Sequence, residues 1–174
     1  MMSTQLHTIA SRDRAAAITD HVAKEIEQWA GVKPKLGKFA LWSRQGGSEP
    51  PGVDAFLRGQ PRPTTPLWKG DLDPAHNGLV ILGTPIGRPE FVERVLQERL
   101  AHQQRLLDGI TGLPDLQAAW LLLLYCAVPR ANHLLRSLPP DEVAAYANAH
   151  DEKIWSTFLQ ICLLYTSDAA DDAH

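Results

Sequence analysis

Basic side chains gather in one stretch of the chain where few acidic ones accompany them. Between residues 33 and 69 the acids Glu49 and Asp54 face a larger set of bases, namely Lys33, Lys35, Lys38, Arg44, Arg58, Arg62 and Lys69. Lysine and arginine at this density can neutralise the phosphates of a nucleic acid. A solvated surface loop also explains the composition, so both interpretations stay open at this point.

Two other motifs look catalytic, but neither has the spacing that its chemistry needs. Asp71 and Asp73 flank Leu72 in a loop, and no His, Asp or Glu is spaced to complete a metal site with them. The turn at residues 83–87 lacks the Gly-Lys-Ser/Thr ending of a phosphate-binding loop. The histidines are scattered, and no serine lies in a nucleophile elbow. These residues alone therefore predict no enzyme.

The composition is that of one soluble globular domain, with 44% hydrophobic and 21% charged residues in a chain of 174. Cys126 and Cys162 form neither a disulfide framework nor a zinc spacing. The chain does not start like a signal peptide, and the apolar run at residues 118–128 is shorter than the roughly 20 residues of a membrane span. We expect an intracellular protein, nuclear or cytoplasmic, that is not secreted and has no membrane partner.

The elements that must position these residues begin with a helix at residues 13–29. Residues 38–42 and 67–69 are short strand candidates. The Gly- and Pro-rich residues 43–66 between them predict an exposed connection. Residues 78–83 are the clearest strand, because apolar and β-branched residues stand between two glycines.

Helices are predicted from Pro89 onward, the first with one apolar face up to Ile110. The second contains residues 118–125, which are apolar nearly all round and are therefore expected to lie centrally in a bundle. Pro129 interrupts it, and residues 137–142 start the last helix. The predicted fold class is α+β, mostly α, with a small antiparallel β element followed by a helical bundle.

Several segments, in order, resemble the back half of a non-LTR (LINE-like) retrotransposon reverse transcriptase. They are residues 36–42, residues 78–87, the helical residues 116–136, and the pairs His150-Asp151 and Ile154-Trp155. The family has a lysine-containing turn after its catalytic strands, then a Val-Leu-Gly-Thr-Pro-x-Gly turn, then thumb helices. The resemblance implies that residues 1–87 are the end of the palm and residues 88–161 the start of the thumb bundle.

Lys38 matches the family's lysine in the first of these turns. The resemblance implies that this lysine acts on the leaving pyrophosphate side, where positive charge stabilises phosphoryl transfer. Phe39 stands where the family usually has threonine, which weakens the assignment. The alternative is a surface lysine at the start of a strand.

The resemblance also implies contacts with nucleic acid. Gly83, Thr84 and Pro85 match the primer-grip turn, whose backbone lies against the sugar-phosphate chain, and Arg130 and Arg136 would line a groove of the thumb. The simpler alternatives are a plain strand-to-helix turn and two solvated arginines at helix ends.

The family's metal-binding aspartates are missing from this sequence. Such polymerases hold two magnesium ions, with the last pair of aspartates in a Tyr/Phe-x-Asp-Asp turn, and no such turn occurs here. We expect no metal site and no cofactor in this chain, Mg²⁺ in the parent enzyme, and no polymerisation by the chain alone. The implied partners are an RNA template, a DNA primer, and the missing upstream fingers and palm of the same polypeptide.

Residues 162–174 are expected to be an artefactual tail, because residues 162–172 resemble a translated transposon-end sequencing adapter. This tail contains Asp168, Asp171 and Asp172 and no Lys or Arg, so the rest of the chain has 17 basic residues and 20 − 3 = 17 acidic residues. A natural, solvated acidic tail is the alternative.

Two other functions stay open. A helical interaction module would have no affinity for nucleic acid, and a non-catalytic accessory protein would bind RNA or DNA without polymerising. A salt-dependent binding titration separates the first of these from the reverse transcriptase fragment. The fragment interpretation also predicts an exposed apolar patch on the palm face, where neighbouring strands are missing.

Overall fold

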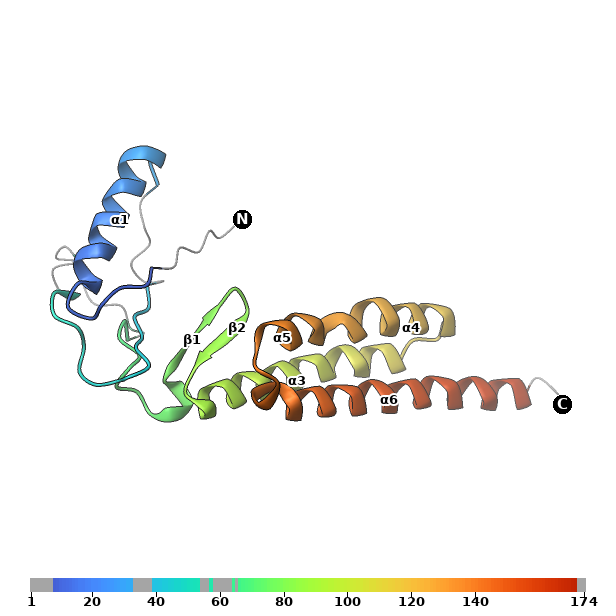
Figure 1. Ribbon diagram of the computed structural model, residues 1–174. Coiled ribbons are helices and arrows are strands. Elements are labelled where there is room, and N and C mark those ends of the chain that lie inside the picture. The colour runs from blue at the N-terminus through green and yellow to red at the C-terminus, as the bar shows by residue number, and fades with distance from the viewer. Residues whose placement is uncertain (1–7, 33–38, 54–56, 58–63, 65, 172–174) are drawn as a thin grey trace. The chain divides into compact units, whose positions relative to one another are not determined.

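The computed structural model describes residues 8–32, 39–53, 57, 64 and 66–171. The chain forms two compact units, Met1–Phe91 and Val92–His174, which we describe one at a time (Figure 1). The fold is mostly helical with a small two-stranded antiparallel sheet, which confirms the predicted fold class. The division after Phe91 is close to the predicted one at residues 87–88, and the assignment of the two parts to palm and thumb stays a prediction.

Helix α1 (Ala15–Ala30) lies in unit 1, where the spacing of apolar residues predicted it. It ends at Gly31, whose φ of 65° is left-handed and whose N–H donates to the carbonyl of Glu27. Glycine adopts this conformation at no steric cost, which is why the helix stops at this residue.

The core of unit 1 is small and consists of Val53, Leu57 and Leu67, with Phe39 and Leu41 packed against it. The predicted strands at residues 38–42 and 67–69 are wrong as strands. Their described residues form one isolated parallel bridge between Leu41 and Trp68. Its hydrogen bonds run from Leu41 N–H to Leu67 O (2.7 Å) and from Lys69 N–H to Leu41 O (2.8 Å). The chain enters a turn at Gly70 and Asp71, so the bridge does not extend into a ladder.

The glycine-rich connection is anchored around Gly46 rather than fully exposed, which corrects the sequence prediction. The guanidinium of Arg12 donates to Gly46 O (3.4 Å), to Ser48 O and to Ser48 Oγ (3.1 Å). The indole of Trp68 donates to Gly47 O (2.8 Å). Side chains distant in sequence therefore hold this loop. The local composition of the loop, from which its exposure was predicted, contains no information about such contacts.

Unit 2 consists of the rest of α3 (Pro89–Thr111) followed by α4 (Leu116–Leu122), α5 (Asn132–Ser137) and α6 (Pro140–Asp171). The predicted start of the second helix is supported by its cap, since the carboxylate of Asp115 accepts from Ala118 N–H at 3.0 Å. In Figure 1, α6 extends beyond the ends of α3 and α4.

The chain stays helical between α4 and α5. A π-helical turn η3 (Leu123–Ala127) is followed by a 3-10 turn η4 (Val128–Ala131) that contains Pro129. Proline has no N–H to donate to the carbonyl one turn earlier in a regular α-helix. The change from π-helical to 3-10 geometry lets the chain remain helical at Pro129 without that hydrogen bond. The π turn has one residue more than an α-helical turn. With it, the buried positions before and after the turn lie on the same side of the segment, and these are Ala119, Leu123, Ala127, Ala131 and Leu134.

The apolar second helix is not central to the bundle, so that prediction is wrong. Leu121, Leu124 and Tyr125 are 43%, 40% and 70% exposed, because neighbouring helices cover only one side of this segment. Because the helical turns continue across Pro129, the segment Leu116–Ser137 could cross a membrane as far as its length and composition go. In its most apolar stretch, 28% of the residues are buried. Core helices of soluble proteins pass the same test, and this finding assigns no location.

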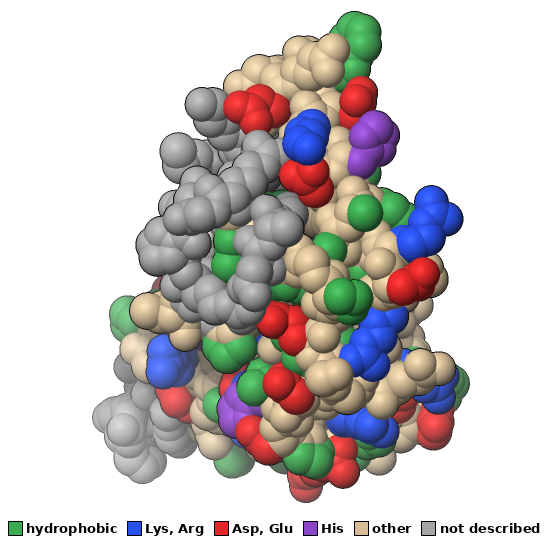
Figure 2. Space-filling view, turned by 90° about the vertical axis from the view of Figure 1, so that its left-hand side faces the viewer, with side chains coloured by type: hydrophobic (Ala, Val, Ile, Leu, Met, Phe, Trp, Pro, Cys, Tyr) green, Lys and Arg blue, Asp and Glu red, His purple; other side chains and the backbone are tan. Residues whose placement is uncertain are grey.

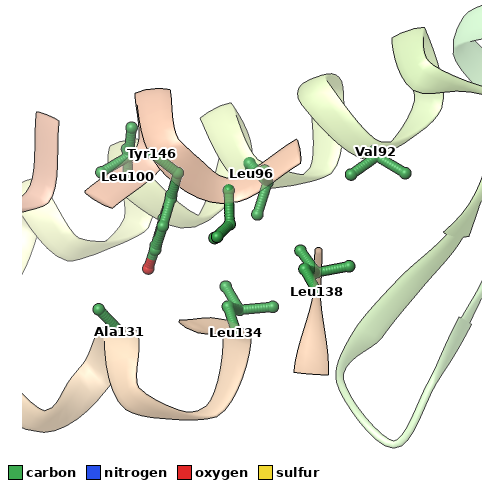
Figure 3. Close-up of a cluster of buried hydrophobic side chains, with 8 residues drawn as sticks. Val92, Leu96, Leu100, Ala131, Leu134, Leu138 and Tyr146 are labelled. Atoms are coloured by element: carbon green, nitrogen blue, oxygen red, sulfur yellow. The ribbon is translucent and has the colours of Figure 1, made fainter. Parts of the chain in front are cut away.

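Two apolar clusters hold unit 2 together. The first, seen in Figure 3, comprises Val92, Leu96, Leu100, Ala131, Leu134, Leu138, Val143 and Tyr146. The second comprises Leu107, Ile110, Ala119, Leu123, Ala127 and Ile161. Both clusters draw on α3, the α4–α5 segment and α6, so the same three helical segments pack together at two places along their length.

A buried polar contact lies between the two clusters along α6. His150 is 3% exposed, with Nδ1 2.9 Å from Gln103 Oε1 and Nε2 3.2 Å from Val128 O. Gln103 Nε2 is buried and has no hydrogen-bond partner among the described residues. With the amide turned over, Nε2 of Gln103 would donate to Nδ1 of a neutral imidazole, whose Nε2–H donates to Val128 O. His150 thereby ties α3 and α6 to Val128, where the π turn gives way to the 3-10 turn.

Candidate nucleic-acid interface

The predicted primer-grip residues lie on a β-hairpin of unit 1. Strand β1 (Gly78–Ile81) pairs antiparallel with β2 (Thr84–Gly87), with Ile81 opposite Thr84 and Gly78 opposite Gly87. The turn consists of Leu82 and Gly83, whose φ angles are 49° and 90°. Positive φ at both central residues is the type I′ geometry that matches the twist of a hairpin. The sequence predicted the first strand and missed the second, since Thr-Pro-Ile-Gly carries no strand signal.

Pro85 fits the hairpin because of its register. The pair that closes a two-residue turn is hydrogen-bonded, and the alternation along an antiparallel ladder then makes Val80 opposite Pro85 a non-hydrogen-bonded pair. The missing N–H of proline is therefore not needed there. At the base of the hairpin a Cβ added to Gly87 would lie 2.5 Å from Asn77 O, so this position has no room for a side chain.

The tip of the hairpin can offer its backbone to a ligand. Leu82 is 71% exposed and Gly83 is half-buried, while Pro85 is buried and anchors the strand that follows. A glycine has no side chain to block a close approach to the backbone, which suits contact with a sugar-phosphate chain. Lys38, the predicted leaving-group lysine, lies outside the described residues.

Arg130 and Arg136 are both exposed on the α4–α5 segment of unit 2, Arg130 in η4 and Arg136 in the last turn of α5. Arg99 of α3 lies near one of them, Arg130. Burial raises the pKa of Tyr146, and the positive charges of Arg99 and Arg130 oppose that rise. Arg99 and Arg130 therefore lie near the same phenol. Arg99 could not be found from the sequence, because its proximity to Arg130 depends on how the helices pack.

On the face shown in Figure 2, basic and acidic side chains of the described residues are interspersed, and neither sign forms a continuous area. That face therefore offers no broad basic field to a polyanion. Among the described residues, no group of three or more His, Cys, Asp and Glu side chains could hold a metal ion.

The candidate residues form two groups. Gly83, Thr84 and Pro85 are contiguous in unit 1, and Arg130 and Arg136 belong to unit 2. No protein-family model matches this chain, and no curated protein or solved structure shows significant similarity to it.

Proposed function

We propose that this chain is part of the reverse transcriptase of a non-LTR retroelement and that it contributes palm and thumb surface that contacts primer and template. The observation that carries the proposal is the hairpin with Gly83, Thr84 and Pro85, which leads directly into the long helix α3. A tight glycine turn before a helical bundle is the arrangement that the resemblance implies for a primer grip. The helical character of unit 2 agrees with the start of a thumb.

The same proposal assigns the chain no polymerase activity of its own. Two-metal phosphoryl transfer needs clustered carboxylates, and the family's Asp-Asp turn is absent from the sequence. With a primer–template, nucleotides and Mg²⁺ we expect no incorporation. Incorporation by the purified chain would contradict this part of the proposal.

Nucleic-acid binding is tested by fluorescence anisotropy with a labelled RNA–DNA primer–template over a series of salt concentrations. If Arg130 and Arg136 each contact one phosphate, the logarithm of the binding constant falls with the logarithm of salt with a slope of about −2. Arg136→Gln should reduce this slope by about one unit.

Arg105, an exposed arginine of α3, provides the matched control. Arg105→Gln makes the same chemical change at another exposed position of unit 2 and should leave the slope as it is. Binding that is absent, or insensitive to salt, would refute the assignment of the two arginines.

A second candidate function is a helical interaction module. The exposure of Trp120 and Trp155, at 42% and 60%, favours it, because large apolar side chains in water mark protein contacts. This candidate predicts no affinity for the primer–template, so the same titration separates the two.

A further inference from the structure

Two arginines from different helical segments of unit 2 lie at the edge of one apolar cluster. Leu100 of α3 and Ala131 of η4 are buried in the first cluster together with Tyr146. Figure 3 shows the Tyr146 ring extending from α6 toward the α4–α5 segment, with its hydroxyl oxygen at the far end. Arg99 and Arg130 directly precede the two buried residues and are themselves exposed. Helix packing therefore brings two arginines that are far apart in sequence to the surface beside the same phenol.

The charges that act on this phenol are positive. Arg99 and Arg130 both oppose the rise in the pKa of Tyr146, and no carboxylate of the described residues contributes. Glu142 lies one turn before Tyr146 on α6 and is exposed, but the ion pairs of the described residues include neither arginine. Two like charges therefore stand near each other without a neutralising carboxylate, and an anion that binds both would relieve their repulsion.

The sequence around the two arginines also lacks acids. Residues 99–107 and residues 116–140 contain no Asp or Glu. A guanidinium presents its N–H groups as a planar fork that matches the oxygens of a phosphate. Forks from two helical segments can hold one phosphate between them, and a phosphodiester of a nucleic-acid strand is the anion that the proposed function supplies.

We propose that Arg99 and Arg130 hold the same backbone phosphate of the bound nucleic acid, as a clamp formed by α3 and η4. This inference rests on the proposed function and adds to it a contact from α3, which no motif of the sequence indicates. The buried ring of Tyr146 fills the space beneath the clamp and sets the spacing of the two segments. Arg136 contacts a second phosphate, so the expected salt slope stays at about −2.

A double-mutant cycle in the same anisotropy titration, with the full chain and the RNA–DNA primer–template, tests the clamp. Arg99→Gln and Arg130→Gln each leave one arginine on the shared phosphate, so each should lower the affinity roughly tenfold while the slope stays near −2. The double variant loses the phosphate contact and should reduce the slope by about one unit. Arg105→Gln on α3 is the matched control and should change neither the affinity nor the slope.

The alternatives give different results. A slope that falls by one unit in each single variant, and by two in the double variant, would mean two separate phosphates and overturns the clamp. Arg99→Gln that binds like the wild type also overturns it, while a reduced slope in Arg136→Gln would leave the proposed function standing. A wild type without salt-dependent affinity refutes the proposed function and the clamp with it.

A conservative variant separates the loss of a phosphate contact from a change in folding. Arg99→Lys keeps the charge and loses the fork, so it should recover part of the affinity that Arg99→Gln loses. Circular dichroism of each variant should match that of the wild type, since both side chains are exposed. Affinity in Arg99→Lys as low as in Arg99→Gln, with helicity reduced in both, would assign Arg99 to the stability of unit 2 and overturn the clamp.

Discussion

The two units of this chain are stabilised in different ways. Unit 2 buries apolar side chains from long helices, with Leu107 and Ile110 each 1% exposed. Unit 1 has a small apolar core and depends on single polar contacts between distant positions. Among these contacts, Trp42 Nε1–H donates to Asn77 Oδ1 (2.7 Å), and Asn77 Nδ2 donates to Gly70 O (2.9 Å).

This difference predicts different responses to substitution. Packing is shared among many contacts, so a cavity in unit 2 weakens the whole unit in proportion to the volume that is removed. A hydrogen bond in unit 1 joins two defined atoms, and its loss leaves a particular donor or acceptor without a partner. The predictions below use one residue at a time to test this contrast.

The largest effect is expected from Leu107→Ala in the second apolar cluster. Leu107 is 1% exposed, and its truncation should lower the free energy of unfolding of unit 2 by about 3 kcal/mol through lost burial and a residual cavity. Chemical denaturation followed by circular dichroism measures this loss. Leu135→Ala makes the same change at a position 42% exposed and should cost much less. Equal losses for the two variants would contradict the assigned interior.

A smaller and more local effect is expected from Asn77→Ala in unit 1. The change removes the acceptor of the Trp42 indole and the donor to Gly70 O, which should cost about 2 kcal/mol. Hydrogen exchange should become faster around residues 39–53 and 66–77, while α6 keeps its protection. Asn148→Ala at an exposed position of α6 is the control and should change neither. Faster exchange throughout both units would argue against separate stabilisation.

The same contrast explains which features the sequence could predict. Periodic apolar residues predicted α1, α3 and the helices after them, because such residues define a face locally. The anchoring of the loop by Arg12 and Trp68 was not predictable, because it joins positions far apart in sequence. The exposure of Tyr125 was missed for a related reason, since composition shows that a helix is apolar but not how many neighbours cover it.

The candidate site was predictable to a similar extent. The resemblance implied a turn at Gly83, Thr84 and Pro85, of which Gly83 alone belongs to the hairpin turn, and strand β2 was missed because Pro85 and Gly87 argue locally against a strand. The register explains their presence, since Pro85 occupies a non-hydrogen-bonded position. The nearness of Arg99 to Arg130 depends on helix packing, which a single sequence does not show.

Alkaline pH should weaken unit 2 through Tyr146. Burial raises the pKa of this phenol above its ordinary value of 10.0, so the folded state holds the proton more tightly than the unfolded state does. The contribution to stability is complete below about pH 10 and is lost as the pH rises through the folded pKa. Thermal denaturation between pH 8 and pH 12 should show a steeper loss for the wild type than for Tyr146→Phe.

Two further variants make that test specific. Tyr125→Phe removes a phenol that is 70% exposed, and its alkaline profile should follow the wild type. Arg130→Gln removes one of the charges that oppose the rise, so the pKa of Tyr146, followed by absorbance of the phenolate, should increase further. An unchanged pKa would mean that Arg130 does not face the phenol.

The smallest effect is expected at acidic pH and in unit 1. The hydrogen bond from His76 holds the pKa of Asp73 below its ordinary value of 3.8, at a distance of 2.9 Å between His76 Nδ1 and Asp73 Oδ2. Because the folded pKa is depressed, this contribution is present above about pH 4 and is lost as the pH falls through the folded value. Asp73 also caps the 3-10 turn η2 (Pro74–His76) by accepting from Ala75 N–H (3.1 Å).

His76→Gln should return the pKa of the Asp73 carboxyl toward 3.8, which an NMR titration of the Asp73 side chain measures. The alkaline transition of Tyr146 should stay where it was. If that substitution also moved the alkaline transition, the two units would share one equilibrium, and the contrast between them would fail.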